Sequence, residues 1–241
     1  MKRNEGIKIP KIFHQLWIGP KPPPKALMKT WRDFHPEWKS MFWNEKTLAE
    51  HFPGGLQNQR QFDDIRELSA KADIARFEIL YKFGGLSIDA DSRCINKLDD
   101  YLLINDSFSC YENEIERGNL IACGNLGATP KNALMKMLIE GIGKMNIKKI
   151  MSLPEPDPWN PKYLGWRLVG PEYLTKTVVE KGYTAISIYP SYFFNPEHYT
   201  GTRYTGPAKS YGIHLWGSTH GSEFEGYSGK TGRPQGKNSK R

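Results

Sequence analysis

With 241 residues, of which 38% are hydrophobic and 12% aromatic, the chain can bury the full hydrophobic core of a globular protein. It has no run of about 18 apolar residues to span a membrane, and its first residues, MKRNEGIKIPK, lack the apolar segment of a signal peptide. The formal net charge of +8 would suit a nucleic-acid partner only if it gathered on the folded part of the chain. We predict a soluble, cytoplasmic protein.

The N-terminal region predicts strands and helices in alternation. The apolar pattern within residues 7–19 predicts a first strand, which ends before a proline-rich turn at 22–24. Residues 25–35 predict a helix, and the aromatic segment 38–44 predicts a second strand. This order is typical of an α/β unit.

The next predicted unit is a helix followed closely by a strand. Apolar residues over 68–83 recur every three or four positions, which predicts an amphipathic helix against a core. The double glycine at 84–85 then predicts a left-handed cap at the end of the helix. The segment LSIDAD, residues 86–91, predicts a short buried strand that ends in Asp89 and Asp91.

The second half of the chain contains extended segments, helices and one proline-rich loop. We find no internal repeat and no second-domain boundary, so we predict one domain over residues 1–225. The predicted elements are extended segments at 108–113 and 119–128, a helix at 131–145, a proline-rich loop at 151–163, a helix at 170–182 and strands around a turn at 183–196.

The C-terminal segment 226–241 contains five of the eight excess positive charges and no acidic residue. It is too polar and glycine-rich to fold, so we predict a disordered basic tail. Charge in a tail argues against nucleic-acid binding, and contact of the tail with an anionic membrane stays open. The cysteines, Cys94, Cys110 and Cys123, form no CxxC pair, which argues against both a disulfide framework and a zinc site.

Asp89 and Asp91 suit a hard divalent cation, because Mg²⁺ and Mn²⁺ prefer oxygen ligands and tolerate substrate phosphates in the same shell. The carboxyl ends of strands are also where open α/β sheets bind ligands. By itself, however, the pattern Asp-x-Asp describes an acidic turn equally well.

The preceding helix contributes two charged pairs. Asp73 and Arg76 are three residues apart and therefore share one helix face, as a sugar and phosphate site or as a structural ion pair. Glu78 and Lys82 are four apart on another face, and we predict a solvent-exposed pair there.

These residues together resemble a known family. The segment SAKADIARFEILYKFGGLSIDADSRC, residues 69–94, resembles the central motif of glycosyltransferase family 32, which has a helical Asp and Arg, a Gly-Gly break, a strand and Asp-x-Asp in this order. The segments IPKIFHQLWIG, HPEWKSMFWN, GNLGATPKNALMKMLIE, GPEYLTKT and HLWGS resemble other blocks of the family in the same order. The resemblance covers most of residues 7–218.

The resemblance implies a single-domain α/β fold of the GT-A class, the Rossmann-like fold of nucleotide-diphospho-sugar transferases, with a mixed central sheet. It implies metal-dependent, retaining transfer of a sugar from a nucleotide-diphosphate sugar, with a UDP-sugar favoured over a GDP-sugar. The acceptor would be a hydroxyl of a glycan, a glycolipid or a protein. A catalytically inactive sugar-nucleotide or carbohydrate-binding protein of the same fold is the alternative.

Roles for the central residues follow from the same resemblance. Asp91 would bind Mn²⁺ or Mg²⁺ directly, and Asp89 would hold ribose or sugar hydroxyls and reach the metal through water. Asp73 and Arg76 would hold the transferred sugar and its phosphate. His214 would be a third metal ligand or a diphosphate contact, unless it is a buried structural histidine.

The resemblance also implies contacts to the nucleotide and sugar outside the central motif. For Trp17 and Trp216, packing in the protein is the alternative, and for Asn125 it is capping of a turn. The residues implied are His14, Gln15 and Trp17 at the base, Asn125 at the sugar, and Trp216 and Ser218 over the leaving diphosphate.

The motif departs from the family at two places. Ser87 and Ile88 stand where an aromatic residue often precedes Asp-x-Asp, and Ala90 replaces the usual threonine. Both changes alter how the sugar would be held without removing the metal ligands. We identify no carboxylate in the sequence that would act as a nucleophile, so we favour attack by the acceptor on the same face as the departing phosphate.

Overall fold

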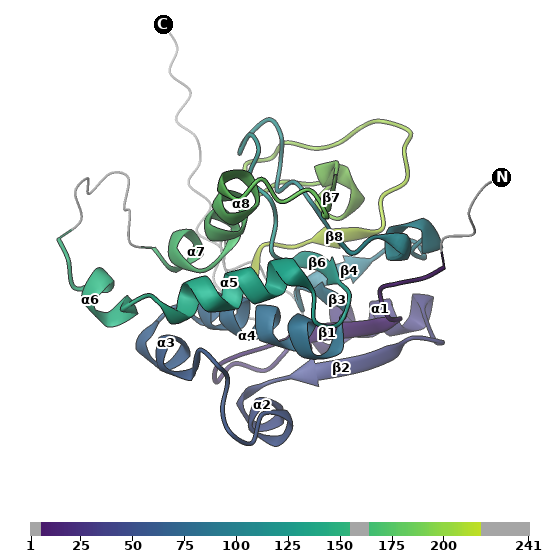
Figure 1. Ribbon diagram of the computed structural model, residues 1–241. Coiled ribbons are helices and arrows are strands. Elements are labelled where there is room, and N and C mark those ends of the chain that lie inside the picture. The colour runs from purple at the N-terminus through teal and green to yellow at the C-terminus, as the bar shows by residue number, and fades with distance from the viewer. Residues whose placement is uncertain (1–5, 155–163, 218–241) are drawn as a thin grey trace, which may run out of the picture.

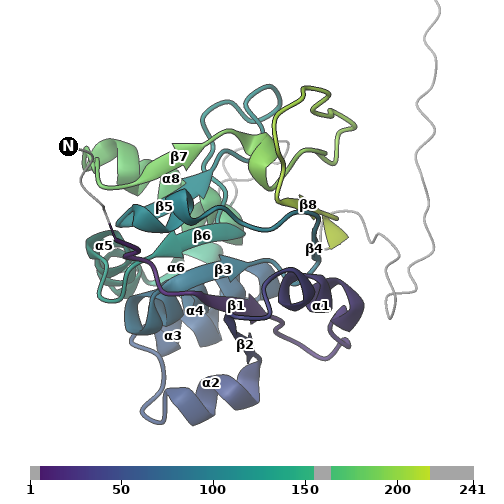
Figure 2. The same ribbon diagram turned by 90° about the vertical axis from the view of Figure 1, so that its right-hand side faces the viewer.

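The computed structural model describes residues 6–154 and 164–217. Its centre is a six-stranded sheet in the order β2-β1-β3-β6-β5-β7, which runs from bottom to top in Figure 2. Only β6 runs antiparallel to its neighbours, so the sheet is mixed, as predicted. The strands are β1 (Ile12–Leu16), β2 (Lys39–Trp43), β3 (Gly85–Ile88), β5 (Ser107–Cys110), β6 (Asn125–Ala128) and β7 (Ser187–Tyr189).

Helices cover the sheet, and the largest is the buried helix α4 (Leu68–Phe83), which packs beside α5 (Ala133–Gly143) (Figure 1). The predicted helices at 25–35, 68–83, 131–145 and 170–182 are all confirmed. The remaining helices are α1 (Lys25–Phe34), α2 (Glu45–His51), α3 (Gln59–Asp64), α6 (Ile147–Met151), α7 (Gly165–Leu168) and α8 (Pro171–Glu180), with 3₁₀ turns η1 (Asp100–Ile104) and η2 (Ser191–Phe193).

Two apolar clusters form the core, one on each face of the sheet. Along β1 the side chains alternate between them, because successive residues of a strand point to opposite faces. Leu16 packs in the cluster that includes α4 and α5, whereas Phe13 packs in the other cluster with Trp31 of α1.

The helix α4 ends at the double glycine, as predicted, but the ψ of −165° at Gly84 differs from that of the predicted left-handed cap. Gly84 and Gly85 have φ of +63° and +99°, which favours glycine. A Cβ on Gly84 would lie 2.7 Å from the nitrogen of Pro130, and one on Gly85 would lie 2.6 Å from the oxygen of Ile12. The two glycines therefore let the chain turn directly from the helix into a central strand.

A second, two-stranded sheet joins distant parts of the chain. Strand β4 (Ser92–Cys94) follows the acidic pair, Asp89 and Asp91. It runs antiparallel to β8 (Gly212–His214), with Ser92 opposite His214. This pairing places His214, which is close to the end of the described chain, beside Asp89 and Asp91.

Two predictions about local structure are wrong. Glu78 is only 2% exposed, because its carboxylate accepts hydrogen bonds from the backbone N–H groups of Gln57 and Asn58. Lys82 donates to the backbone oxygen of His51 instead of pairing with Glu78. Segment 183–196 forms one strand, β7, followed by a 3₁₀ turn, where strands around a turn were predicted.

Some predictions fall outside the described residues or concern the membrane. The basic tail at 226–241, with its membrane contact, and residues 155–163 of the proline-rich loop lie outside the part that the structure describes. Among the described residues, no helix has both the length and the apolar character needed to cross a membrane.

His14 ties three elements together inside the core. Its Nε2 lies 2.7 Å from the oxygen of Gly84, and its Nδ1 accepts a hydrogen bond of 3.1 Å from the indole of Trp43. The tautomer that fits carries its proton on Nε2. Burial, the largest effect, lowers the pKa of His14 to about 4, so the imidazole is neutral at pH 7.

This depressed pKa predicts an acid-sensitive fold. The unfolded chain binds a proton at His14 near the usual pKa of about 6.5 whereas the folded chain does not, so stability is present above that pH and is lost toward pH 4. Between pH 7.5 and 5 this group removes about 2 kcal/mol of unfolding free energy. Urea unfolding at both pH values should show a smaller loss for His14→Gln; equal losses would contradict the assignment.

Candidate active site

The acidic pair lies in a tight turn at the end of β3. The backbone N–H of Asp89 donates to Gly124 (2.9 Å), and Ser92 donates from its N–H and its hydroxyl to the backbone oxygen of Asp89. The indole of Trp31 in turn donates to the Ser92 hydroxyl at 3.1 Å. These bonds hold the turn in place, so the Asp89 side chain has a defined position.

Asp91 is held from the other side by the chain that follows β8. Its backbone oxygen accepts from the N–H of Leu215 (3.0 Å), and its Oδ2 accepts from the N–H of Gly217 (2.8 Å). The second carboxylate oxygen, Oδ1, faces His214 Nε2 at 3.2 Å. Asp91 therefore uses one oxygen for structure and directs the other into the site.

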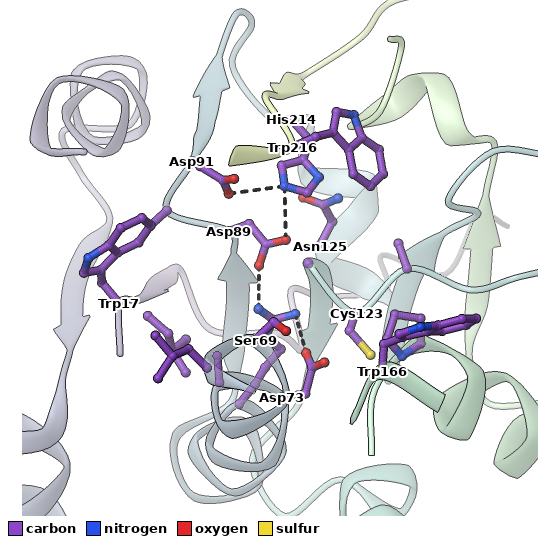
Figure 3. Close-up of a pocket in the computed structure, with 18 of the residues that line it drawn as sticks. Trp17, Ser69, Asp73, Asp89, Asp91, Cys123, Asn125, Trp166, His214 and Trp216 are labelled. Atoms are coloured by element: carbon purple, nitrogen blue, oxygen red, sulfur yellow. Dashed lines mark hydrogen bonds and ion pairs between the residues drawn. The ribbon is translucent and has the colours of Figure 1, made fainter. Parts of the chain in front are cut away.

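Five charged or titratable side chains form one continuous chain across the site, which the dashed lines in Figure 3 follow. Arg76 lies between Asp73 (Nη1 to Oδ1, 3.2 Å) and Asp89 (Nη2 to Oδ1, 2.5 Å). The other oxygen of Asp89 lies 3.7 Å from His214 Nε2, which also contacts Asp91. The shared face predicted for Asp73 and Arg76 is confirmed.

Burial and charge set the protonation states along this chain. Burial, with repulsion from Asp89, raises the pKa of Asp73 to about 7 despite the attraction of Arg76. Burial opposes the charged form of His214, but attraction to Asp91, a hydrogen bond with Asp91 and the charge of Asp89 together raise its pKa to about 9. Burial likewise opposes the charged form of Asp91, yet His214 and the Gly217 N–H hold its pKa below the usual value.

Asp89, Asp91 and His214 offer a group of ligand atoms that all lie within 4.8 Å of one another. Two carboxylates and an imidazole suit Mn²⁺, and the oxygen ligands also suit Mg²⁺. Asp89 would bind such a cation while Arg76 keeps its other oxygen in place. The side chains present therefore fit a divalent cation.

These groups line a pocket of about 620 Å³, which is within the range of small-molecule sites. Its walls come from α4, the ends of β1, β3 and β6, and the chain around β8. The predicted residues that line it are Trp17, Asp73, Arg76, Asp89, Asp91, Asn125, His214 and Trp216.

The structure does not place every predicted residue in the pocket. His14 and Gln15 are buried and do not line it, whereas Trp17 does, and contact with the nucleotide base stays a prediction. Ser218 lies outside the described residues. Asn125 is buried, and its amide lies 3.4 Å from the side-chain oxygen of Asn195.

Trp216 occupies a strained position at the pocket wall. Its φ of +55° lies in the left-handed region, which costs a residue other than glycine of order 1–3 kcal/mol. Its indole N–H donates to the oxygen of Glu197 (3.0 Å), and its ring lies 4.3 Å from that of His214. The indole thus covers the imidazole of the candidate metal ligand.

Sequence reasoning missed one wall of the pocket. Glu112 and Arg117 line it from the connection between β5 and β6, Trp166 from α7 and Tyr199 from the chain after η2. These residues lie in irregular segments or very short elements, where no periodic pattern marks them.

Gly124 leaves the space that Asp89 requires. A Cβ on Gly124 would lie 2.1 Å from Oδ2 of Asp89, so the carboxylate oxygen that faces His214 would have to move. We expect Gly124→Ala to lower turnover by roughly a hundredfold, because displacement of a catalytic group has costs of this order. Steady-state rates test this against Gly54→Ala, where nothing lies within 4 Å of the new Cβ. Equal rates in the two variants would contradict the geometry.

One family model matches the part of the chain that contains Asp89 and Asp91. Residues 24–109 match the family model described as "Glycosyltransferase sugar-binding region containing DXD motif". The predicted family resemblance is confirmed. Within the matched residues of this DXD region, the one Asp-x-Asp is Asp89-Ala90-Asp91.

Proteins similar to this chain occur in fungi and in a virus. "Inositol phosphoceramide mannosyltransferase 3" of Schizosaccharomyces pombe is 33% identical over 105 residues, 41% of this chain and 29% of that protein. "Uncharacterized glycosyltransferase L373" of Acanthamoeba polyphaga mimivirus is 26% identical over 140 residues, 56% of this chain and 55% of that protein. The chain therefore matches only part of the length of these relatives.

A solved structure confirms the predicted fold. "PaToxG Glycosyltransferase" superposes with a TM-score of 0.52 at 13% sequence identity and covers 72% of this chain and 70% of that chain. The mixed α/β sheet is thus that of a GT-A domain.

Proposed function

We propose that this protein transfers a sugar from a nucleotide-diphosphate sugar to a hydroxyl of a glycan, glycolipid or protein acceptor, with Mn²⁺ or Mg²⁺ as cofactor. The observation that carries the proposal is the meeting of Asp89, Asp91 and His214 with the Asp73–Arg76 pair in one pocket. The DXD region and the GT-A fold support it. A cytoplasmic location stays a prediction.

The residues of the site would have different roles in the reaction. Asp89, Asp91 and His214 would hold the cation, which would offset the negative charge that grows on the departing diphosphate. Arg76 is buried, and its Nε has no hydrogen-bond partner among the described residues. An oxygen of the donor would satisfy this N–H, which fits the proposed contact of Arg76 with the sugar and its phosphate.

We propose that transfer retains the anomeric configuration. Each carboxylate that lines the pocket already has a charged partner. Asp73 and Asp89 contact Arg76, Asp91 contacts His214, and Glu112 contacts Arg117. The bond from sugar to phosphate would break as the acceptor oxygen attacks from the same face. The proton of the acceptor hydroxyl would pass to the departing phosphate oxygen.

Turnover of a donor panel tests the proposed function. UDP-glucose, UDP-galactose, UDP-N-acetylglucosamine and GDP-mannose would be incubated with Mn²⁺ or with EDTA, and the released nucleotide would be measured. The mannosyltransferase named among the relatives is the reason for including GDP-mannose. We expect release from a UDP-sugar that requires the metal, with an α-linked product by NMR.

Each departure from that result has a separate meaning. Turnover of GDP-mannose alone would overturn the UDP preference, and a β-linked product would overturn retention. Undiminished release in EDTA would overturn the metal dependence. Metal-dependent binding of a nucleotide without release from any donor would favour the inactive sugar-nucleotide-binding alternative.

A further inference from the structure

One wall of the pocket has no role in the donor site described above. Figure 3 shows Trp166 on this wall, across the pocket from Trp17. Glu112 and Arg117 line the same wall from the β5–β6 connection. Among the described residues, none of the three forms an ion pair with Asp73 or Arg76, so they are a second set of polar groups facing the same space.

Glu112 and Trp166 hold Arg117 in a fixed orientation and leave some of its N–H donors open. Its Nε lies 3.1 Å from Oε1 of Glu112, and its guanidinium lies 4.9 Å from the centre of the Trp166 ring. Its side chain is 28% exposed, and its two Nη groups make no hydrogen bond within the described part of the chain. A stacked guanidinium with open N–H groups is ready to bind oxygen atoms of a ligand.

The partner of Arg117 defines the kind of ligand that fits. Glu112 is nearly buried, and its Oε1 also lies 3.6 Å from Nε2 of His198. A carboxylate here would repel an anionic ligand, whereas it accepts hydrogen bonds from hydroxyl groups. Donors on Arg117 beside an acceptor on Glu112 match neighbouring hydroxyls on a neutral sugar ring.

The pocket is joined by further space next to Arg117 and Trp166. A second hollow of about 330 Å³ is lined by Glu116, Arg117, Leu120, Trp166 and Glu172. Arg117 and Trp166 line both the pocket and this hollow, so they lie where the two adjoin. A ligand longer than one sugar ring could thus lie in both.

We propose that Glu112, Arg117 and Trp166 form an acceptor subsite, and that the acceptor is the end of an oligosaccharide. The terminal ring would bind between Glu112 and Arg117, with its hydroxyl toward the donor sugar, and the next ring would lie in the second hollow. Trp166 is a positioning residue that orders Arg117. This inference rests on the proposed function, because it needs a donor in the same pocket.

The test separates acceptor binding from donor chemistry. The probes are a panel of neutral mono- to tetrasaccharides, measured by saturation-transfer NMR with nucleotide and Mn²⁺ and then as acceptors of the donor that the enzyme uses. Donor hydrolysis without acceptor serves as the second readout. We expect Arg117→Ala and Glu112→Gln to raise the KM for an oligosaccharide about tenfold or more, the loss typical of a charged hydrogen-bonding group, with hydrolysis unchanged.

Arg60→Ala is the matched control, because Arg60 is 70% exposed on α3 and pairs with Asp64 at 3.8 Å. The inference is overturned if Arg117→Ala has the acceptor KM of this control, or if its donor hydrolysis falls together with transfer. It is also overturned if no saccharide binds to a wild-type protein that hydrolyses donor. Failure of the wild type to bind or use any donor would instead overturn the proposed function, and this inference with it.

Discussion

Replacing Asp91 with asparagine is expected to abolish measurable sugar transfer while the protein stays folded. Asparagine has nearly the same shape and can still accept the N–H of Gly217 through its side-chain oxygen. It cannot supply the negative charge that a divalent cation and His214 require. Loss of an electrostatic group of this kind lowers turnover by roughly a hundredfold to a thousandfold.

Donor hydrolysis and transfer rates measure this effect, and circular dichroism with thermal melting verifies folding. Asp100→Asn is a suitable control, because Asp100 is a 63% exposed residue whose ion pair with Lys11 lies outside the pocket. Substantial activity in Asp91→Asn would remove Asp91 from the proposed metal site.

Asp73→Asn is expected to reduce turnover by roughly a hundredfold but to change nucleotide binding far less. The pKa of Asp73 is about 7, so the folded protein tolerates a neutral group there near neutral pH. A sugar-binding role therefore predicts a folded, slow enzyme. Loss of a hydrogen bond to charged Asp73 that strengthens in the transition state would account for the fall in rate.

Replacement of Arg76 tests the same sugar-binding role but also lowers the stability of the protein. Arg76→Ala would leave Asp73 and Asp89 without their shared counter-charge, and breaking a buried pair destabilises by roughly 3–5 kcal/mol. Arg76→Lys retains the charge and is the variant to compare. The measurements are kcat, nucleotide Kd and melting temperature for each variant. If Asp73→Asn unfolds the protein, the pair is a structural ion pair.

The local part of the site could be predicted from the sequence because its signals are close together along the chain. The spacing of Asp73 and Arg76 fixes a shared helix face, and Gly84 and Gly85 lead directly into the strand before Asp89. Helix period, glycine conformation and strand direction each act within a few residues, so a pattern can report them.

The features that the sequence did not indicate depend on contacts with distant segments. Glu78 was expected at the surface because it stands four residues before Lys82, but the backbone at Gln57 and Asn58 covers it. The base contact of His14 stays a prediction, and the sequence did not indicate that Gly84 and Trp43 occupy its two ring nitrogens. Neither contact has a signal in the local sequence.

The positions of His214 and of the proposed acceptor subsite also depend on contacts between distant segments. His214 reaches Asp91 only because β8 pairs with β4, more than a hundred residues earlier, and the family resemblance alone pointed to it. Glu112, Arg117 and Trp166 have no such resemblance and lie in irregular or very short elements. Their meeting in one pocket could be recognised only from the fold.

The central claim is that Asp89 and Asp91 form a metal site that binds a nucleotide diphosphate. Thermal melting of wild type and Asp91→Asn with UDP, GDP, CDP and dTDP, each with Mn²⁺ and with EDTA, tests it most directly. A ligand that binds the native state raises the melting temperature. We predict stabilisation by UDP that requires both the metal and Asp91. No shift with any nucleotide in folded wild-type protein, or the same shift in EDTA, would contradict the claim.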